Sequence, residues 1–63
     1  MKTNEFLRLL KKHGINPELV KHGGNHDIYY LEETNEIMVL PRHQAEELKP
    51  GLLNKLMKQA GLK

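Results

Sequence analysis

Apolar residues spaced as on a helix mark both ends of the chain. Near the start, positions at intervals i, i+3, i+4 and i+7 share one helical face, namely Phe6, Leu9, Leu10 and His13. Thr3 or Asn4 is expected to cap the start of this helix, and Gly14 to end it. The same spacing recurs near the end at Leu53, Leu56, Met57 and Ala60. A second helix is therefore predicted after Pro50-Gly51.

Three short apolar runs between these helices predict strands. The first run contains Leu19 and Val20 and ends near residue 22, the second covers 26–31, and the third covers 37–40. Such β-branched and aromatic residues fit a pleated surface. Gly23-Gly24 is expected to form the two-residue turn of a hairpin, because both positions tolerate positive φ. A polar turn is expected at 33–35, and Pro41 ends the third run by removing a backbone donor.

The order of these elements predicts an α+β fold. Short connections favour an α-β-β-β-α arrangement, with a three-stranded antiparallel sheet and both helices on one face. The chain has 63 residues, and since domains usually begin at about 50 residues we expect a single domain, 1–63. Alternation along the second and third strands makes both of their faces apolar. We predict that the face without helices binds a partner; its residues are Ile28, Tyr30, Ile37 and Val39.

The composition excludes several kinds of chemistry. The chain has no Cys and no Ser, so it has no disulfide, no thiolate nucleophile and no Cys-ligated zinc. Covalent catalysis through a hydroxyl is not expected either, because Thr3 and Thr34 are the only threonines. No apolar run approaches the roughly 20 residues that span a bilayer, and a signal-peptide core is absent. We therefore expect a cytoplasmic protein that does not bind membranes.

Charge is segregated along the chain, although the net charge is only +2. The segments 2–12 and 49–63 are basic, and the segment between them is acidic. Basic terminal helices can attract a polyanion. Equally, lysines can simply solvate helix surfaces and favour helix C-terminal ends. Charge alone does not decide between these readings.

Four histidines stand out in a chain without Ser or Cys, namely His13, His22, His26 and His43; His13 is interpreted as a cation at the C-terminal end of the first helix. A metal site is not predicted, because Gly23-Gly24 breaks any helix that would bring His22 and His26 together and no third ligand is evident. His26 follows a tight turn at the start of a strand, where a rigid element presents it to solvent. Its ordinary pKa allows proton transfer near neutral pH. An exposed hairpin histidine is also a common polar surface residue, so the residues alone leave both readings open.

Four short motifs together resemble one known family. The stretch 23–29 (GGNHDIY) resembles the Gly-x-His hairpin of the HicA family, the small toxins of bacterial toxin–antitoxin pairs. The stretch 40–43 (LPRH) resembles that family's strand-ending Pro-x-His, and 49–51 (KPG) resembles its helix entry. Residues 56–62 resemble its closing helix. The likeness spans essentially the whole chain, although many relatives have Ser or Lys at Asn25 and a second His at Asp27.

This resemblance implies a fold and an activity. HicA-like proteins have a fold similar to the double-stranded-RNA-binding domain and act as endoribonucleases on messenger RNA. They need no metal or other cofactor, and a HicB-type antitoxin silences them. Their activity depends on the hairpin histidine, which is His26 in this sequence.

The missing nucleophiles are consistent with such an activity, because RNA supplies its own 2′-hydroxyl. His26 is expected to act as general base or acid, while Lys21, Arg42 or His43 supplies positive charge or the second proton transfer. Of these, His43 is the candidate helper, and the alternative reading is a polar loop residue without a catalytic role. The residues expected to contact RNA are Lys21, Asn25, Tyr30, Arg42, Lys49 and Lys55. Tyr30 is a candidate to stack on an unpaired base if it lies beside His26.

Two other functions fit the same fold. One is a non-catalytic RNA-binding module that uses the basic helices, with a clear salt dependence. The other is a protein-interaction module that uses the apolar face of the hairpin and ignores nucleic acid.

Overall fold

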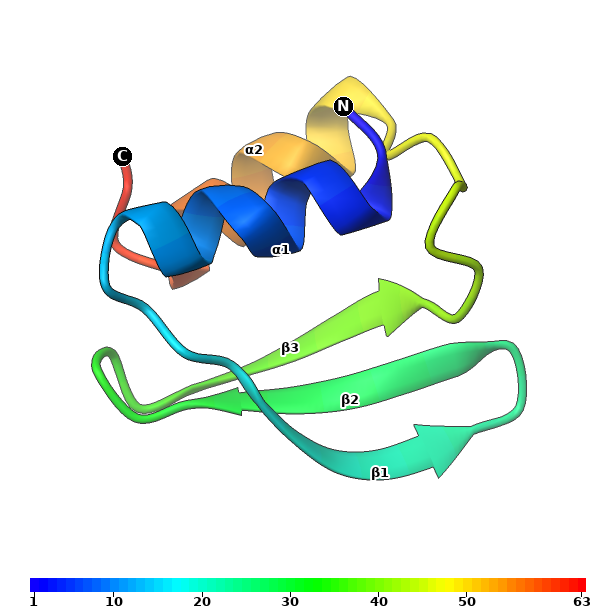
Figure 1. The fold of residues 1–63 in the computed structure, drawn as a ribbon, viewed down its shortest axis with the longest axis horizontal. Coiled ribbons are helices and arrows are strands. Elements are labelled where there is room, and N and C mark those ends of the chain that lie inside the picture. The colour runs from blue at the N-terminus through cyan, green and yellow to red at the C-terminus, as the bar shows by residue number, and fades with distance from the viewer.

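Two helices lie side by side on one side of a three-stranded sheet in the computed structural model, which describes all 63 residues (Figure 1). The predicted α+β fold, with both helices on one face, is confirmed. Neither helix is long and apolar enough to cross a membrane. The elements are α1 (Thr3–Lys12), β1 (Glu18–Gly23), β2 (His26–Leu31), β3 (Glu36–Pro41) and α2 (Pro50–Gln59).

The sheet is an antiparallel meander in the order β1-β2-β3. Strands β2 and β3 pair without interruption, from His26 opposite Pro41 to Leu31 opposite Glu36. Strand β1 pairs with β2 less regularly, because the register shifts between Leu19 and Lys21. Every residue of β1 is exposed, so this edge strand adds little to the core.

The core lies between the helices and the inner face of β2 and β3. Leu31, Met38 and Leu40 are fully buried, and they pack with side chains from both helices, such as Phe6 and Leu56. The other face of these strands carries no covering element (Figure 1). We call it the open face and define it by Ile28, Tyr30, Ile37 and Val39, the same residues that the alternation assigns to it. On this face Ile37 remains 51% exposed and Val39 47% exposed.

Helix α1 begins differently from the prediction. The N-cap residue is Lys2, and neither Thr3 nor Asn4 caps the helix. Instead the N–H groups of Thr3 and Asn4 donate to the carbonyl oxygens of Glu46 (3.0 Å) and Gln44 (2.9 Å). Tertiary partners thus satisfy donors that a capping side chain would otherwise take. As a consequence, the loop 42–49 is fixed against the start of α1.

The carboxylate of Glu5 satisfies one more donor at this end of α1. It accepts a hydrogen bond from the Lys2 N–H at 2.7 Å. That bond is the main reason why the pKa of Glu5 lies below its usual value, because it stabilises the ionised form. The start of α1 is therefore held by its own first turn as well as by the loop.

The two faces of β3 predict opposite responses to truncation. Met38→Ala is expected to lower the free energy of unfolding by about 2–5 kcal/mol, because it leaves a cavity in the core. Ile37→Ala, on the open face of the same strand, is the matched control and is expected to cost about 1 kcal/mol or less. Urea unfolding of both variants measures the difference. Equal losses would contradict the assignment of the two faces.

Candidate active site at the end of the first hairpin

A two-residue turn presents His26 at the end of the β1–β2 hairpin. The turn consists of Gly24 and Asn25, since Gly23 is the last residue of β1 and pairs with His26. The prediction of a Gly23-Gly24 turn is therefore wrong by one residue. Only Gly24 has positive φ, at 57°, as the first position of a type II′ turn requires. The His26 side chain is exposed at the first position of β2.

Arg42 ties this turn to the end of β3. Its backbone N–H donates to the carbonyl of Asn25 at 2.9 Å, and its Nη1 donates to the carbonyl of Gly24 at 3.2 Å. Both carbonyls of the turn therefore accept a hydrogen bond from one residue. This arrangement places a guanidinium, which keeps its charge at any physiological pH, at the same end of the hairpin as His26.

A second histidine at the hairpin end is held by a carboxylate. His22 pairs with Asp27 across the strands, and its Nδ1 lies 2.8 Å from Asp27 Oδ1. Arg42 Nε lies 3.9 Å from the same oxygen. The Asp27 side chain is only 13% exposed, whereas that of His22 is 56% exposed. The carboxylate thus orients an imidazole that remains open to solvent. The sequence suggests His22 only as a possible metal ligand and gives no sign of this pair.

Strand alternation sorts the predicted residues around His26. Lys21 pairs with Ile28 and shares the face of His26, at the diagonal position that is usually about 7–8 Å away. His43 is exposed and lies two residues after Pro41, which pairs with His26. His22 and Asp27 point to the helix side, because Lys21 and His26, which precede them in their strands, belong to the open face and successive side chains alternate. Within the paired strands, Lys21 is therefore the predicted residue that shares the face of His26, whereas His43 lies beyond the end of β3.

Three predicted RNA-binding residues lie away from His26. Tyr30 shares its face but sits four residues along the strand, about 13 Å away, and its hydroxyl donates to Asn35 Oδ1 at 2.9 Å. The structure therefore does not bring Tyr30 beside His26. Lys49 is the N-cap of α2, and Lys55 lies within α2. Both belong to the helical layer, on the other side of the sheet from the open face (Figure 1).

No three His, Cys, Asp or Glu side chains gather closely enough to hold a metal ion. The hairpin end instead combines an exposed imidazole, a fixed guanidinium and a carboxylate-bound second imidazole. These are groups that can transfer protons and stabilise an anion.

The fold and this site define a small α+β domain that exposes a histidine at a hairpin end. Comparison with known families identifies it further, because residues 3–62 match the family described as the HicA toxin of bacterial toxin–antitoxin systems. The chain therefore belongs to the HicA toxin family.

Curated relatives match the chain over nearly its full length. The protein named "Probable mRNA interferase toxin HicA" from Escherichia coli strain K12 is 37% identical over 62 residues, covering 98% of both chains. The protein named "Probable mRNA interferase HicA 1" from Photorhabdus laumondii is 36% identical over 62 residues, covering 98% of this chain and all of the relative. No solved structure matches the chain significantly.

The turn geometry predicts opposite effects for two glycine substitutions. Gly24→Ala is expected to lower the free energy of unfolding by about 1–2 kcal/mol, because a side chain disfavours positive φ. Gly51→Ala is the control. An added Cβ meets no atom within 4 Å at either glycine, so the two positions differ in backbone conformation and not in space. Gly51 lies in α2 and has no positive φ. This substitution is expected to raise stability by about 0.5–1 kcal/mol. A stabilising Gly24→Ala in the same denaturation assay would contradict the turn assignment.

Proposed function

We propose that this chain is a toxin that cuts messenger RNA in the cytoplasm as a metal-independent endoribonuclease, with His26 as its proton-transfer group. The observation that carries the proposal is the exposed His26, presented by a turn whose carbonyls are both hydrogen-bonded to Arg42. The names of the relatives, which call them probable mRNA interferases, support the choice of substrate.

The reaction uses the nucleophile that RNA already contains. A base takes the proton of the 2′-hydroxyl, the 2′-oxygen forms a bond to the adjacent phosphorus, and the bond from phosphorus to the 5′-oxygen breaks. An acid then donates a proton to the leaving 5′-oxygen. His26 performs one of these transfers. The Arg42 guanidinium and the Lys21 ammonium stabilise the negative charge that develops on the phosphoryl oxygens.

The second proton transfer falls to His43. Its position two residues beyond Pro41, the partner of His26 in the sheet, supports this role. His22 is less suited, since it belongs to the helix side of the hairpin whereas His26 belongs to the open face. The pair formed by His22 and Asp27 instead supports the shape of the hairpin end.

A HicB-type antitoxin covers the open face in this proposal. Ile37 and Val39 leave about half of their surface exposed, and a neighbouring apolar patch of this kind typically marks a binding surface. His26 lies at the end of the same face. A partner docked on Ile28, Tyr30, Ile37 and Val39 would therefore also obstruct the approach of RNA to His26, so one contact explains both binding and silencing.

Loss of the imidazole tests the catalytic assignment. His26→Ala is expected to slow cleavage of single-stranded RNA in EDTA by about 10²–10⁴-fold, the usual contribution of a general acid or base. Its free energy of unfolding should stay near that of the wild type, because the side chain is exposed. His13→Ala is the matched control, an exposed histidine at the end of α1, and should cut normally. Undiminished cleavage by His26→Ala would refute the assignment.

A charge placed on the open face tests the antitoxin contact. Val39→Lys is expected to weaken the complex with the antitoxin at least tenfold, about 1.4 kcal/mol, because it puts an ammonium into an apolar contact. Leu19→Lys is the control, since Leu19 is 44% exposed but pairs with Tyr29 on the other face. Calorimetric titration measures both. If Val39→Lys binds as the wild type does, the antitoxin docks elsewhere.

A further inference from the structure

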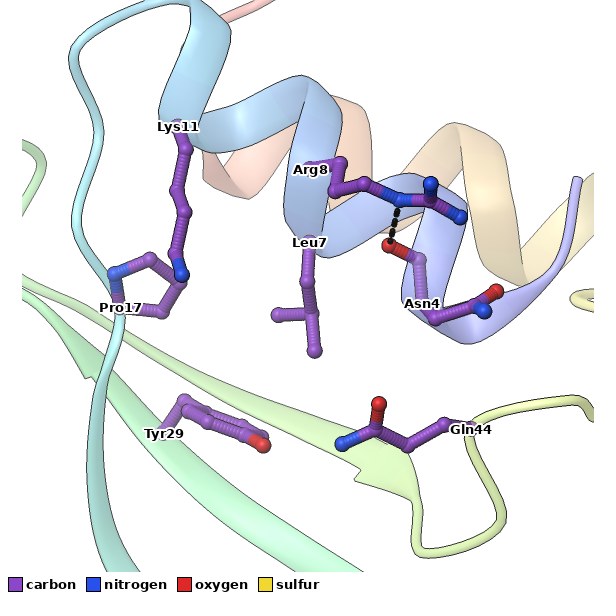
Figure 2. Close-up of a pocket in the computed structure, with 7 residues that line it drawn as sticks. All are labelled: Asn4, Leu7, Arg8, Lys11, Pro17, Tyr29 and Gln44. Atoms are coloured by element: carbon purple, nitrogen blue, oxygen red, sulfur yellow. Dashed lines mark hydrogen bonds between the residues drawn. The ribbon is translucent and has the colours of Figure 1, made fainter.

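A groove on the helix side of the sheet has a lining suited to a nucleotide. It lies between α1 and the sheet, and Figure 2 shows Leu7 from above and the Tyr29 ring from below enclosing it. Its volume is about 580 Å³, within the range of about 300–1,000 Å³ typical of small-molecule sites. The lining residues are Asn4, Leu7, Arg8, Lys11, Pro17, Tyr29 and Gln44.

The groove is cationic and contains no acidic side chain. Helix α1 contributes Arg8 and Lys11 to it, and both are exposed. Neither forms a salt bridge with a carboxylate; the Arg8 Nε donates only to the Asn4 carbonyl, at 3.5 Å. Two cations without a salt-bridge partner on one rim favour an anionic ligand such as a phosphate group.

The floor and the far end of the groove suit a nucleobase. The half-buried Tyr29 ring offers an apolar surface on which a base can stack. The Tyr29 hydroxyl is protonated at neutral pH, as tyrosine ordinarily is, and can donate a hydrogen bond; burial, and secondarily Asp27, raises the pKa of Tyr29 further. Asn4 and Gln44 add carboxamides, which both donate and accept. The Asn4 Oδ1 is buried and has no hydrogen-bond partner, so this oxygen reaches a ligand only if the amide turns, and the turn breaks no hydrogen bond of that oxygen.

We propose that this groove binds a nucleotide of the RNA substrate, with its base on Tyr29 and its phosphate near Arg8 and Lys11. The inference rests on the proposed function, because it assigns the groove to the same RNA that His26 cleaves. It adds a binding site on the helix side of the sheet, distinct from the hairpin end.

The position of the groove relative to His26 fits a single RNA strand. Tyr29 lies three residues along β2 from His26, about 10 Å away. Between them, on the helix side of the hairpin, lie Asp27 and its partner His22, next to Arg42. A strand that leaves the groove toward the hairpin end therefore passes Arg42 before it reaches His26.

An acidic protein segment is the competing occupant, but the lining favours RNA. A docked peptide draws most of its affinity from buried apolar anchors. Apart from the Tyr29 ring, the apolar side chains of the lining are only Leu7 and Pro17. The neighbouring pair of half-exposed apolar residues Ile37 and Val39 lies on the open face instead.

Binding of a non-cleavable RNA tests the groove. The probe is a fluorescently labelled, 2′-O-methylated single-stranded RNA of mixed sequence, whose affinity is measured by anisotropy at two salt concentrations. The groove variant Arg8→Gln/Lys11→Gln is expected to bind at least tenfold more weakly than the wild type. The slope of its log affinity against log salt concentration should fall by about 0.7, the contribution of one neutralised phosphate on a single strand.

The matched control removes the same charge outside the groove. Lys12→Gln/Lys58→Gln alters two exposed helix lysines that do not line the groove and is expected to change affinity less than twofold. Tyr29→Leu keeps an apolar side chain but removes the ring, and this variant should also bind the probe at least tenfold more weakly than the wild type. With an abasic version of the probe, which has no base to stack, the wild type and Tyr29→Leu should bind equally. In cleavage assays the groove variant should raise KM and leave kcat unchanged.

Three results separate the possible failures. Equal losses of RNA affinity in the groove variant and the control variant would overturn the proposal, because they would mean that RNA is attracted to the positive charge of the protein in general. It would likewise be overturned if the groove variant lost antitoxin binding but kept its RNA affinity, since that assigns the groove to a protein. If the wild type binds the probe through the groove but cuts no RNA, the groove site is supported and the nuclease function fails.

Discussion

The pairing of Gly23 with His26 across the Gly24-Asn25 turn is the constraint on which the rest of the site depends. Side chains alternate between faces along a strand, so a slip of one residue would move every side chain of β1 to the opposite face. The observed register puts His22 against Asp27 and places Lys21 diagonally from His26. Arg42 reinforces it from β3 through its bonds to the two turn carbonyls.

The two sides of the sheet differ in character in a chain that buries only 11 of its 63 residues. The helix side holds the core under α2 and α1 and leaves a cationic groove where α1 meets β2. The open face keeps its apolar residues exposed and carries His26 at its end. In the proposed function, one side of this small domain binds RNA, and the other presents His26 and the apolar surface for the antitoxin.

The features that depend on local periodicity could be predicted from the sequence. The helical and strand repeats determine which residues face the core, and the open face follows from them. The cap of α1 could not be predicted, because its first N–H groups bond to Glu46 and Gln44, some 40 residues away in sequence. The turn was misplaced by one residue since Gly23 and Gly24 tolerate the same conformations, and this error concealed the pair formed by His22 and Asp27. The groove was missed because Tyr29 and Gln44 join α1 only in the folded chain.

The chemical ends of the cleaved RNA test the central claim most directly. If the 2′-oxygen attacks its own phosphodiester, mass spectrometry of products formed in EDTA should find a 2′,3′-cyclic phosphate on one fragment and a 5′-hydroxyl on the other. A 3′-hydroxyl together with a 5′-phosphate would mean that water, and not the ribose, is the nucleophile, and would contradict the account.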